Sequence, residues 1–217
     1  MKVGALISGG KDSLAAAYKA SKEHNLVCLI AIKSKNPESY MFHIPNIDLV
    51  KLQAETMQLP LIFLETEGIK EEELRDLKDA IEIAKEKYQI RGLVSGAIAS
   101  KYQKQRIEAI CDQLDLRSIT PLWNIIPFIY ARELLRDFHI IITGIAAEGL
   151  DESDLGKRFN LNFLDKIKKL EVHKFGEGGE FETFVLNCPL FKKPLKVKSF
   201  KDISTGENSW IREIKVE

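Results

Sequence analysis

Apolar residues follow two alternating patterns in the first half of the chain, short unbroken runs and longer stretches in which they recur every three or four positions. The runs predict strands at residues 2–7, 27–32, 61–64 and 93–94, and a fifth strand is expected at residues 117–120, ending at Pro121. The longer stretches predict the helices between them, at residues 13–24, 46–57, 69–88 and 101–114. Strands joined through helices run parallel. The expected fold class is α/β, a Rossmann-like parallel five-stranded sheet with helices on both faces.

The second half of the chain has a different pattern. After a proline-containing segment at residues 121–127, the spacing predicts a helix at 128–138, a very apolar strand at 139–145 and a further helix through Phe163 and Ile167. Shorter apolar or alternating runs predict strands at residues 184–186, 195–198 and 211–216, the last two joined by a turn at 204–208. We therefore expect two domains, residues 1–123 and a smaller α+β domain of residues 124–217, with a site at their interface.

Two local predictions concern the helices of the first half. Asn46 precedes the second helix and is of the type that caps helix N-termini, so we expect it to be the cap. The acidic cluster at residues 71–73 lies in the first turn of the third helix, where carboxylates interact favourably with the helix dipole. We interpret this cluster as a solvent-facing surface.

Composition limits the class of protein. The 217 residues are 45% hydrophobic and 29% charged, which is typical of a globular protein, and 32 basic residues balance 32 acidic ones. Zero net charge gives no general attraction to nucleic acid or to an anionic membrane. The chain lacks a leader pattern and an apolar run long enough to span a bilayer, and Cys28, Cys111 and Cys188 lie far apart in apolar contexts. We expect a cytoplasmic protein with reduced, buried cysteines.

The segment at residues 8–13, Ser-Gly-Gly-Lys-Asp-Ser, carries the clearest chemistry. It lies between the first strand and the first helix, where glycines free backbone N–H groups for an anion and the helix N-terminus adds positive potential. Lys11 supplies a charge, Ser8 and Ser13 supply hydroxyl groups, and Asp12 is a candidate metal ligand. The spacing excludes a Walker A loop, because Ala5 stands where the first glycine is required. A tight turn without a ligand is the alternative interpretation.

Further candidates follow the strands, since ligands of open α/β sheets bind beyond the carboxyl ends of the strands. Four of them are candidates for adenosine contacts: Ile32, Lys33, Ser95 and Gly96. The polar start of the next helix, with Tyr102, Gln103 and Arg106, either holds a ligand or partner or is an exposed helix face. His43 either contacts nucleotide or substrate or packs in its own loop.

A second motif, Phe-Gly-Glu-Gly-Gly-Glu-Phe-Glu-Thr, occupies residues 175–183. Its glycines allow a tight bend, and Glu177, Glu180 and Glu182 place carboxylates around that bend. Such a cluster is suited to binding Mg²⁺ or ammonium, or to accepting a proton from ammonium. The alternative is a glycine bulge at the start of a strand, with the glutamates in water.

Five segments together resemble the diphthine–ammonia ligase family of PP-loop, or N-type, ATP pyrophosphatases: residues 8–13, 41–46, 95–106, 144–148 and 176–183. The resemblance spans both expected domains, and the last segment is its most specific part. It implies the adenine nucleotide alpha hydrolase-like fold and an ATP-dependent reaction with Mg²⁺. In that reaction the carboxylate of diphthine on translation elongation factor 2 is adenylated, pyrophosphate leaves, and ammonia displaces AMP to give diphthamide.

The resemblance also implies roles for residues. Lys11, Asp12, Glu177, Glu180 and Glu182 are the expected catalytic residues, with Asp12 on the metal. Residues 8–13 hold the triphosphate, and Ile32, Lys33, Ser95 and Gly96 contact adenosine. The expected substrate contacts, including ammonia, are His43, Tyr102, Gln103, Arg106, Glu148, Gly178 and Gly179.

Two other functions compete. A PP-loop enzyme that modifies tRNA bases is the first, but thiolation usually needs a cysteine cluster, and the zero net charge argues weakly against a tRNA partner. A non-catalytic adenine-nucleotide sensor is the second, but it leaves the lysine and the glutamate-rich motif without a purpose. We expect free ammonium as the nitrogen donor, because no segment remains for a glutaminase domain.

Overall fold

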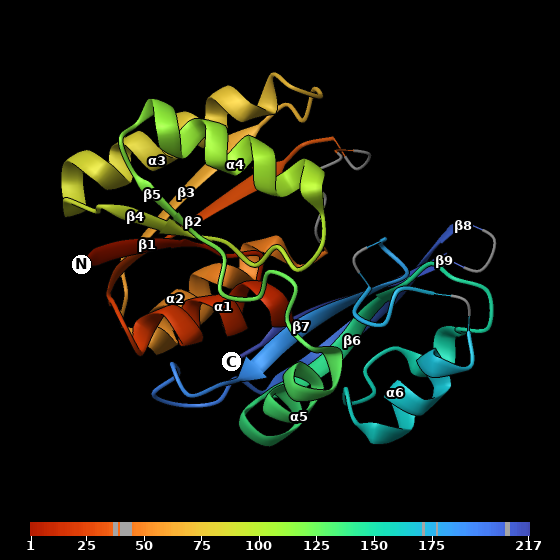
Figure 1. The fold of residues 1–217 in the computed structure, drawn as a ribbon. Helices are drawn as coiled ribbons and strands as arrows, with labels where there is room; N and C mark the ends of the chain where they lie inside the picture. The colour runs from red at the N-terminus through yellow and green to blue at the C-terminus, as the bar shows by residue number, and fades with distance from the viewer. Residues whose placement is uncertain (37–38, 40–44, 171, 177, 207–208) are drawn as a thin grey trace.

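A computed structural model describes residues 1–36, 39, 45–170, 172–176, 178–206 and 209–217. Its first sheet has five parallel strands in the order β3-β2-β1-β4-β5 (Figure 1). The strands are β1 (Lys2–Leu6), β2 (Asn25–Ser34), β3 (Leu61–Thr66), β4 (Gly92–Val94) and β5 (Arg117–Ile119). The predicted α/β fold is confirmed, with strand positions close to those expected from the apolar runs.

Helices cover both faces of this sheet. They are α1 (Lys11–Ser21), the short 3₁₀ helix η1 (Ile47–Leu49), α2 (Val50–Met57), α3 (Glu73–Tyr88) and α4 (Lys101–Gln113). Helices α1 and α2 lie on one side of the sheet, and α3 and α4 lie on the other (Figure 1). Helix α1 begins at Lys11, two residues earlier than predicted, so the lysine and the aspartate of the 8–13 loop belong to its first turn.

The second sheet is antiparallel, in the order β7-β6-β9-β8. It contains β6 (His139–Ile145), β7 (Phe181–Asn187), β8 (Val197–Gly206) and β9 (Ser209–Val216), accompanied by α5 (Pro127–Asp137), η2 (Glu152–Asp154) and α6 (Leu161–Lys168). The α+β character predicted for this half is confirmed. Strand β8 is longer than expected, because it pairs with β9 as far as the Gly206–Ser209 position and so leaves a shorter turn.

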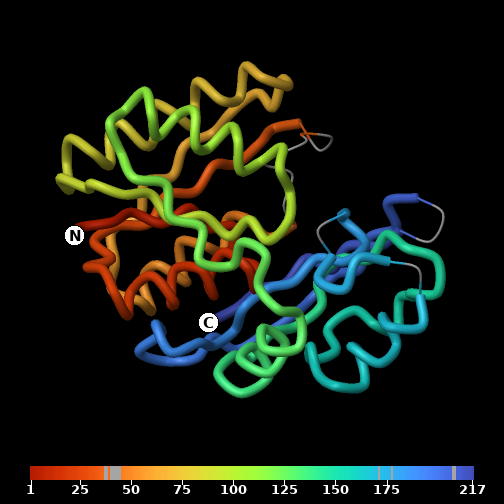
Figure 2. Tube along the Cα trace, viewed as in Figure 1, coloured from red at the N-terminus to blue at the C-terminus, as the bar shows by residue number. Residues whose placement is uncertain are grey.

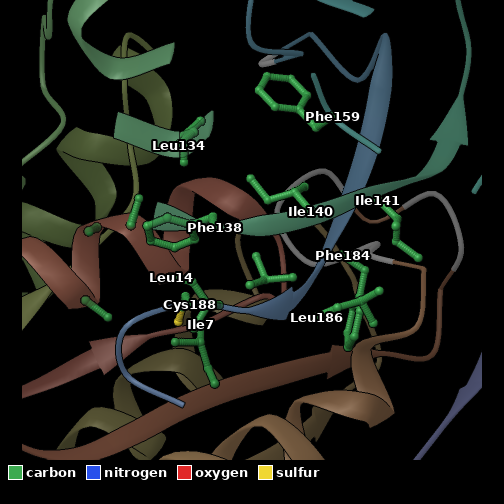
Figure 3. Packing of buried hydrophobic residues seen from close by; sticks show 14 of the residues in the cluster. Ile7, Leu14, Leu134, Phe138, Ile140, Ile141, Phe159, Phe184, Leu186 and Cys188 are labelled. Carbon is green, nitrogen blue, oxygen red and sulfur yellow. The ribbon is translucent and has the colours of Figure 1, made fainter. Parts of the chain in front are cut away.

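The two sheets share one hydrophobic core. Ile7 and Leu14, from the start of the chain, pack in the same cluster as Phe138, Ile140 and Phe184 from the second half (Figure 3). A separate cluster fills the space between the first sheet and helices α3 and α4. All three cysteines are buried and unpaired, as predicted. The shared core holds β7 beside the beginning of α1 (Figure 2).

Two local predictions were wrong. Asn46 does not cap a helix with its side chain: it adopts a left-handed conformation, with φ at 64°. Its side chain donates to the Arg212 carbonyl and accepts from the Ile214 N–H of β9, each at 2.9 Å. The acidic cluster is not uniformly solvated, since Glu73 is 1% exposed and accepts a 2.6 Å hydrogen bond from Ser39 Oγ. Within the described residues, no helix is both long and apolar enough to cross a membrane.

Candidate active site

The turn between β1 and α1 requires glycine at position 9. Gly9 has φ at +84°, which L side chains rarely adopt. A Cβ there would also lie 3.2 Å from Phe184 and 3.3 Å from both Gln53 and Val50. Because Gly9 has no side chain, the loop can pack closely against α2 and β7.

The hydroxyl groups of the loop face one another at the start of α1. Ser8 donates its N–H to Ser13 Oγ at 3.1 Å, and the two hydroxyl oxygens are also 3.1 Å apart. Ser13 in turn donates to the Gly10 carbonyl at 3.1 Å. Polar groups thus gather at a helix N-terminus, where the first N–H groups and the helix dipole favour an anion. The arrangement suits phosphate.

Strand β7, an edge strand of the second sheet, lies along this loop. The Val185 N–H donates to the Gly9 carbonyl at 3.0 Å, and the Lys11 N–H donates to Thr183 Oγ1 at 3.2 Å. Gln53, which is fully buried, bridges the two segments by donating to the carbonyls of Gly9 and Val185. The two motifs of the sequence, residues 8–13 and 175–183, therefore form one site.

The Lys11 ammonium group connects both motifs directly. It is 3% exposed and donates to the Phe175 carbonyl at 2.5 Å and to Asp12 Oδ2 at 2.8 Å. It also lies 5.2 Å from the centroid of the Phe181 ring, within the range of a cation–π interaction. A buried cation held by a carbonyl, a carboxylate and a ring is well placed to stabilise negative charge that develops beside it.

Asp12 is held from the other side by Tyr130. The Tyr130 hydroxyl donates to Asp12 Oδ1 at 2.6 Å, and its fully buried ring packs 5.0 Å from the ring of Phe175. Sequence reasoning missed Tyr130. It occurs at helical spacing with the buried Leu134, a pattern that indicates a core residue, and no local signal connects it with a residue 118 positions earlier.

Glu182, a carboxylate of the second motif, interacts electrostatically with both Lys11 and Asp12. Burial raises its pKa to about 7, Lys11 opposes the increase, and the negative charge of Asp12 adds to it. Gly144 lies opposite Glu182 in β6, and a Cβ on Gly144 would come within 2.9 Å of Glu182 Cβ. The Glu182 carboxyl group, with its pKa raised to about 7, therefore packs against Gly144 of β6 and interacts electrostatically with the Lys11 cation.

The other glutamates have different surroundings. Glu180 accepts hydrogen bonds from the N–H groups of His173 at 2.8 Å and Gly178 at 2.9 Å, so its carboxylate holds the bend of its own loop. Gly179 has φ at +83° and is exposed, with open space around it. Glu148 is exposed in the turn after β6. Glu177 lies outside the described residues.

The candidate nucleotide contacts fall into two groups. Gly96 packs directly on α1, because a Cβ there would lie 2.8 Å from the Ser13 nitrogen, and Ser95 is buried with no hydrogen-bond partner for its hydroxyl among the described residues. Strand β2 extends beyond its pairing with β1, which ends at Ile30, so Ile32 pairs only with β3. The Ile32 side chain lies in the core, and Lys33 pairs with Asp48 at 2.7 Å. These two residues would therefore meet a nucleotide chiefly through their main chain.

Tyr102 and Arg106 form a cluster with Glu71 at the starts of α4 and α3. Both donate to Glu71 Oε1, and the Arg106 guanidinium lies 3.4 Å from the Tyr102 ring centroid. The Gln103 N–H is capped by Ser100 Oγ at 3.4 Å. This cluster presents a cation and a ring beyond the carboxyl ends of the strands. His43 lies outside the described residues.

Two family models match this chain, one in each half. The model of the diphthamide synthase N-terminal domain matches residues 1–118, and that of the C-terminal domain matches residues 127–215. The chain belongs to the diphthamide synthase family. The two matched regions thus include both motifs of the site, residues 8–13 in the first and residues 175–183 in the second.

Individual proteins agree with this family. The protein named diphthine–ammonia ligase in Mus musculus is 37% identical, with 92% of this chain and 84% of the mouse protein covered. The Homo sapiens protein of that name is 35% identical over the same shares of the two chains. A crystal structure of a predicted tRNA methyltransferase subunit from Methanocaldococcus jannaschii shares 19% identity at a TM-score of 0.46, covering 89% of this chain and 99% of its own.

The described side chains of the site do not by themselves form a metal centre. Among the residues that the structure describes, no group of three or more His, Cys, Asp or Glu side chains is arranged to hold one. Mg²⁺ commonly takes one or two protein carboxylates, completing its shell with phosphates and water. Asp12, within the 8–13 loop and the first turn of α1, fits that limited role.

Proposed function

We propose that this protein is a diphthine–ammonia ligase, which uses ATP to convert the diphthine carboxylate of translation elongation factor 2 into the amide of diphthamide. Two hydrogen bonds of Lys11 carry the proposal. Its N–H donates to Thr183 Oγ1, and its ammonium group donates to the Phe175 carbonyl. It joins a phosphate-binding loop to the glutamate-containing loop. Similarity to proteins named for this reaction supports the assignment.

The two halves of the chain divide the work in this proposal. Residues 1–123 bind ATP: the 8–13 loop and the start of α1 hold the phosphates, while Ser95, Gly96 and the main chain of Ile32 and Lys33 contact adenosine. Residues 124–217 supply the loop at which ammonia reacts. Tyr102, Gln103, Arg106 and His43 remain candidates for contacts with the protein substrate.

In the first half-reaction a carboxylate oxygen of diphthine attacks the α-phosphorus of ATP. The bond between the α-phosphorus and the bridging oxygen breaks, and pyrophosphate leaves. Lys11 and the N-terminus of α1 stabilise the negative charge that accumulates on the phosphates. Mg²⁺, when bound, would neutralise part of the pyrophosphate charge, with Asp12 as its protein ligand.

In the second half-reaction ammonia attacks the acyl carbon and AMP leaves with the electrons of the broken C–O bond. The nitrogen must lose a proton as the amide forms, and Glu182 is the acceptor that we assign. Its raised pKa, about 7, keeps it able both to take and to release a proton near neutral pH. Glu177, Glu180 and Glu148 are proposed to orient ammonia, with Gly178 and Gly179 giving the loop its shape.

The reaction is tested by incubating the purified protein with ATP, Mg²⁺, ammonium and diphthine-bearing elongation factor 2. AMP release and the mass of the substrate are followed together. Conversion of carboxylate to amide with an equal amount of AMP is the expected result. ATP binding without AMP would favour a nucleotide sensor, and AMP formation that requires tRNA would favour base modification.

Replacement of Tyr130 by phenylalanine should lower kcat about tenfold while leaving the KM for ATP within about twofold. The substitution keeps the ring against Phe175 but removes the hydrogen bond that orients Asp12. The Mg²⁺ concentration that gives half-maximal activity should rise. Tyr18→Phe, on α1, is the matched control. An unchanged Mg²⁺ requirement with normal kcat would contradict an orienting role for Tyr130.

A further inference from the structure

The first turn of α5 presents apolar side chains to solvent. Ile126, Phe128 and Ile129 are 60%, 76% and 47% exposed, and Pro127 between them is also exposed. Other large exposed apolar residues among the described ones are separated along the chain, and the two that share β8, Val197 and Phe200, are three residues apart. Single exposed apolar residues are ordinary, whereas a contiguous group marks a surface that is covered in use. We call residues 126–129 the apolar patch.

The apolar patch directly precedes a residue of the candidate active site in α5. The next residue, Tyr130, turns inward, and its hydroxyl binds Asp12. Helix α5 therefore carries solvent-exposed apolar side chains on one side and a residue of the site on the other. A protein partner that places a side chain beside Asp12 would bring its own surface near this turn.

A small ligand does not explain the apolar patch. The cavity between α1 and α5 has a volume of about 30 Å³, and none of residues 126–129 lines it. Sites for small molecules are concave and about ten times larger or more. Exposed Phe and Ile side chains on a helix turn resemble instead the anchors of protein–protein contacts, which are few and apolar or aromatic.

We propose that the apolar patch docks the protein substrate, covering the surface around the modified side chain while that side chain enters the site. This inference rests on the proposed function, because the diphthine carboxylate is attached to a folded protein and cannot diffuse in alone. A second copy of this chain is the competing occupant, and it is distinguished by the test below.

The test is the double variant Phe128→Gln/Ile129→Gln, which keeps helix-compatible residues and removes the apolar surface. Steady-state AMP release is measured while diphthine-bearing elongation factor 2 is varied, and again while ATP is varied. We expect the KM for the protein substrate to rise at least tenfold, with kcat and the KM for ATP within about twofold of wild type. The pair Phe200→Gln/Ile83→Gln, whose residues are 59% and 40% exposed on β8 and α3, serves as the matched control and should behave as wild type.

Each remaining outcome overturns the inference in a recognisable way. An unchanged KM for the protein substrate shows that the apolar patch does not dock it, although the ligase assignment stands. A parallel rise in the KM for ATP shows that the variant acts through Tyr130 and the site. A wild-type dimer that the variant converts to monomer, measured by sedimentation, assigns the patch to self-association. Absence of wild-type turnover with this substrate removes the proposed function and the docking inference together.

Discussion

Replacement of Lys11 by methionine is expected to lower kcat for amide formation by roughly 10²–10³-fold, the usual loss when one preorganised charge-stabilising group is removed. Methionine retains most of the apolar stem but cannot stabilise the phosphates or bind the Phe175 carbonyl. The defect should appear in single-turnover release of pyrophosphate, because the proposed mechanism assigns Lys11 to the adenylation step. Binding of ATP should weaken less than kcat falls.

A control separates this effect from a general loss of positive charge. Lys35→Met removes an exposed lysine that pairs with Glu67 and should leave turnover unchanged. Thermal unfolding without ATP reports whether the Lys11 variant still folds. A folded Lys11→Met protein that releases pyrophosphate at the wild-type rate would rule out the role given to this lysine.

Replacement of Glu182 by glutamine should lower kcat/KM for ammonium by roughly 10²–10⁴-fold, the range of general-base contributions. In the wild type this parameter should rise with pH through about 7 as Glu182 loses its proton. Glutamine cannot accept the proton, so only the ionisation of ammonium itself should remain in the pH profile. Persistence of the inflection near pH 7 in the variant would assign it to another group. Glu55→Gln, on the exposed side of α2, should retain the wild-type profile.

Ionisation of the Glu182 carboxyl group should affect stability in the opposite direction to activity. Burial raises its pKa from 4.5 to about 7, so the folded state holds a proton that the unfolded state has released. The free energy of unfolding of the wild type should therefore fall as pH increases from about 4.5 to about 7, by at most ~3 kcal/mol from this group. Urea unfolding at pH 5 and pH 8 should show a smaller decrease in Glu182→Gln. Above pH 7 the Glu182→Gln variant should therefore be less active than the wild type but lose less stability, as expected where a buried charge is kept for function.

The sequence was most informative where structure depends on local patterns. Apolar runs located the strands of the first sheet because a strand buried on both faces needs little besides continuous apolar side chains. The position of the 8–13 loop was equally predictable, since consecutive glycines between an apolar strand and a helix indicate a tight turn, and anion binding by that turn stays a prediction. These features require only neighbours in the sequence.

Features that depend on distant partners were not predictable in this way. Asn46 has the residue type of a helix cap, but β9 offers its side chain two main-chain groups, and pairing with them determines its position. Glu73 looks like a solvated carboxylate until Ser39 and the surrounding core cover it. For Glu180 the sequence indicated a carboxylate at a glycine bend, but not that backbone N–H groups of that bend would bind it.

The hydrogen bond from the Lys11 N–H to Thr183 also has a consequence in time, because it joins residues 172 positions apart. Ribosomes add ~5–20 residues per second, so roughly 10–30 s separate the synthesis of the two partners. During that interval Gly9 and Gln53 lack the strand that they bind in the folded protein, and Leu14 lacks part of its apolar cover. The 8–13 motif of the nascent chain is thus made well before it is able to take its finished shape, which requires that β7 has emerged.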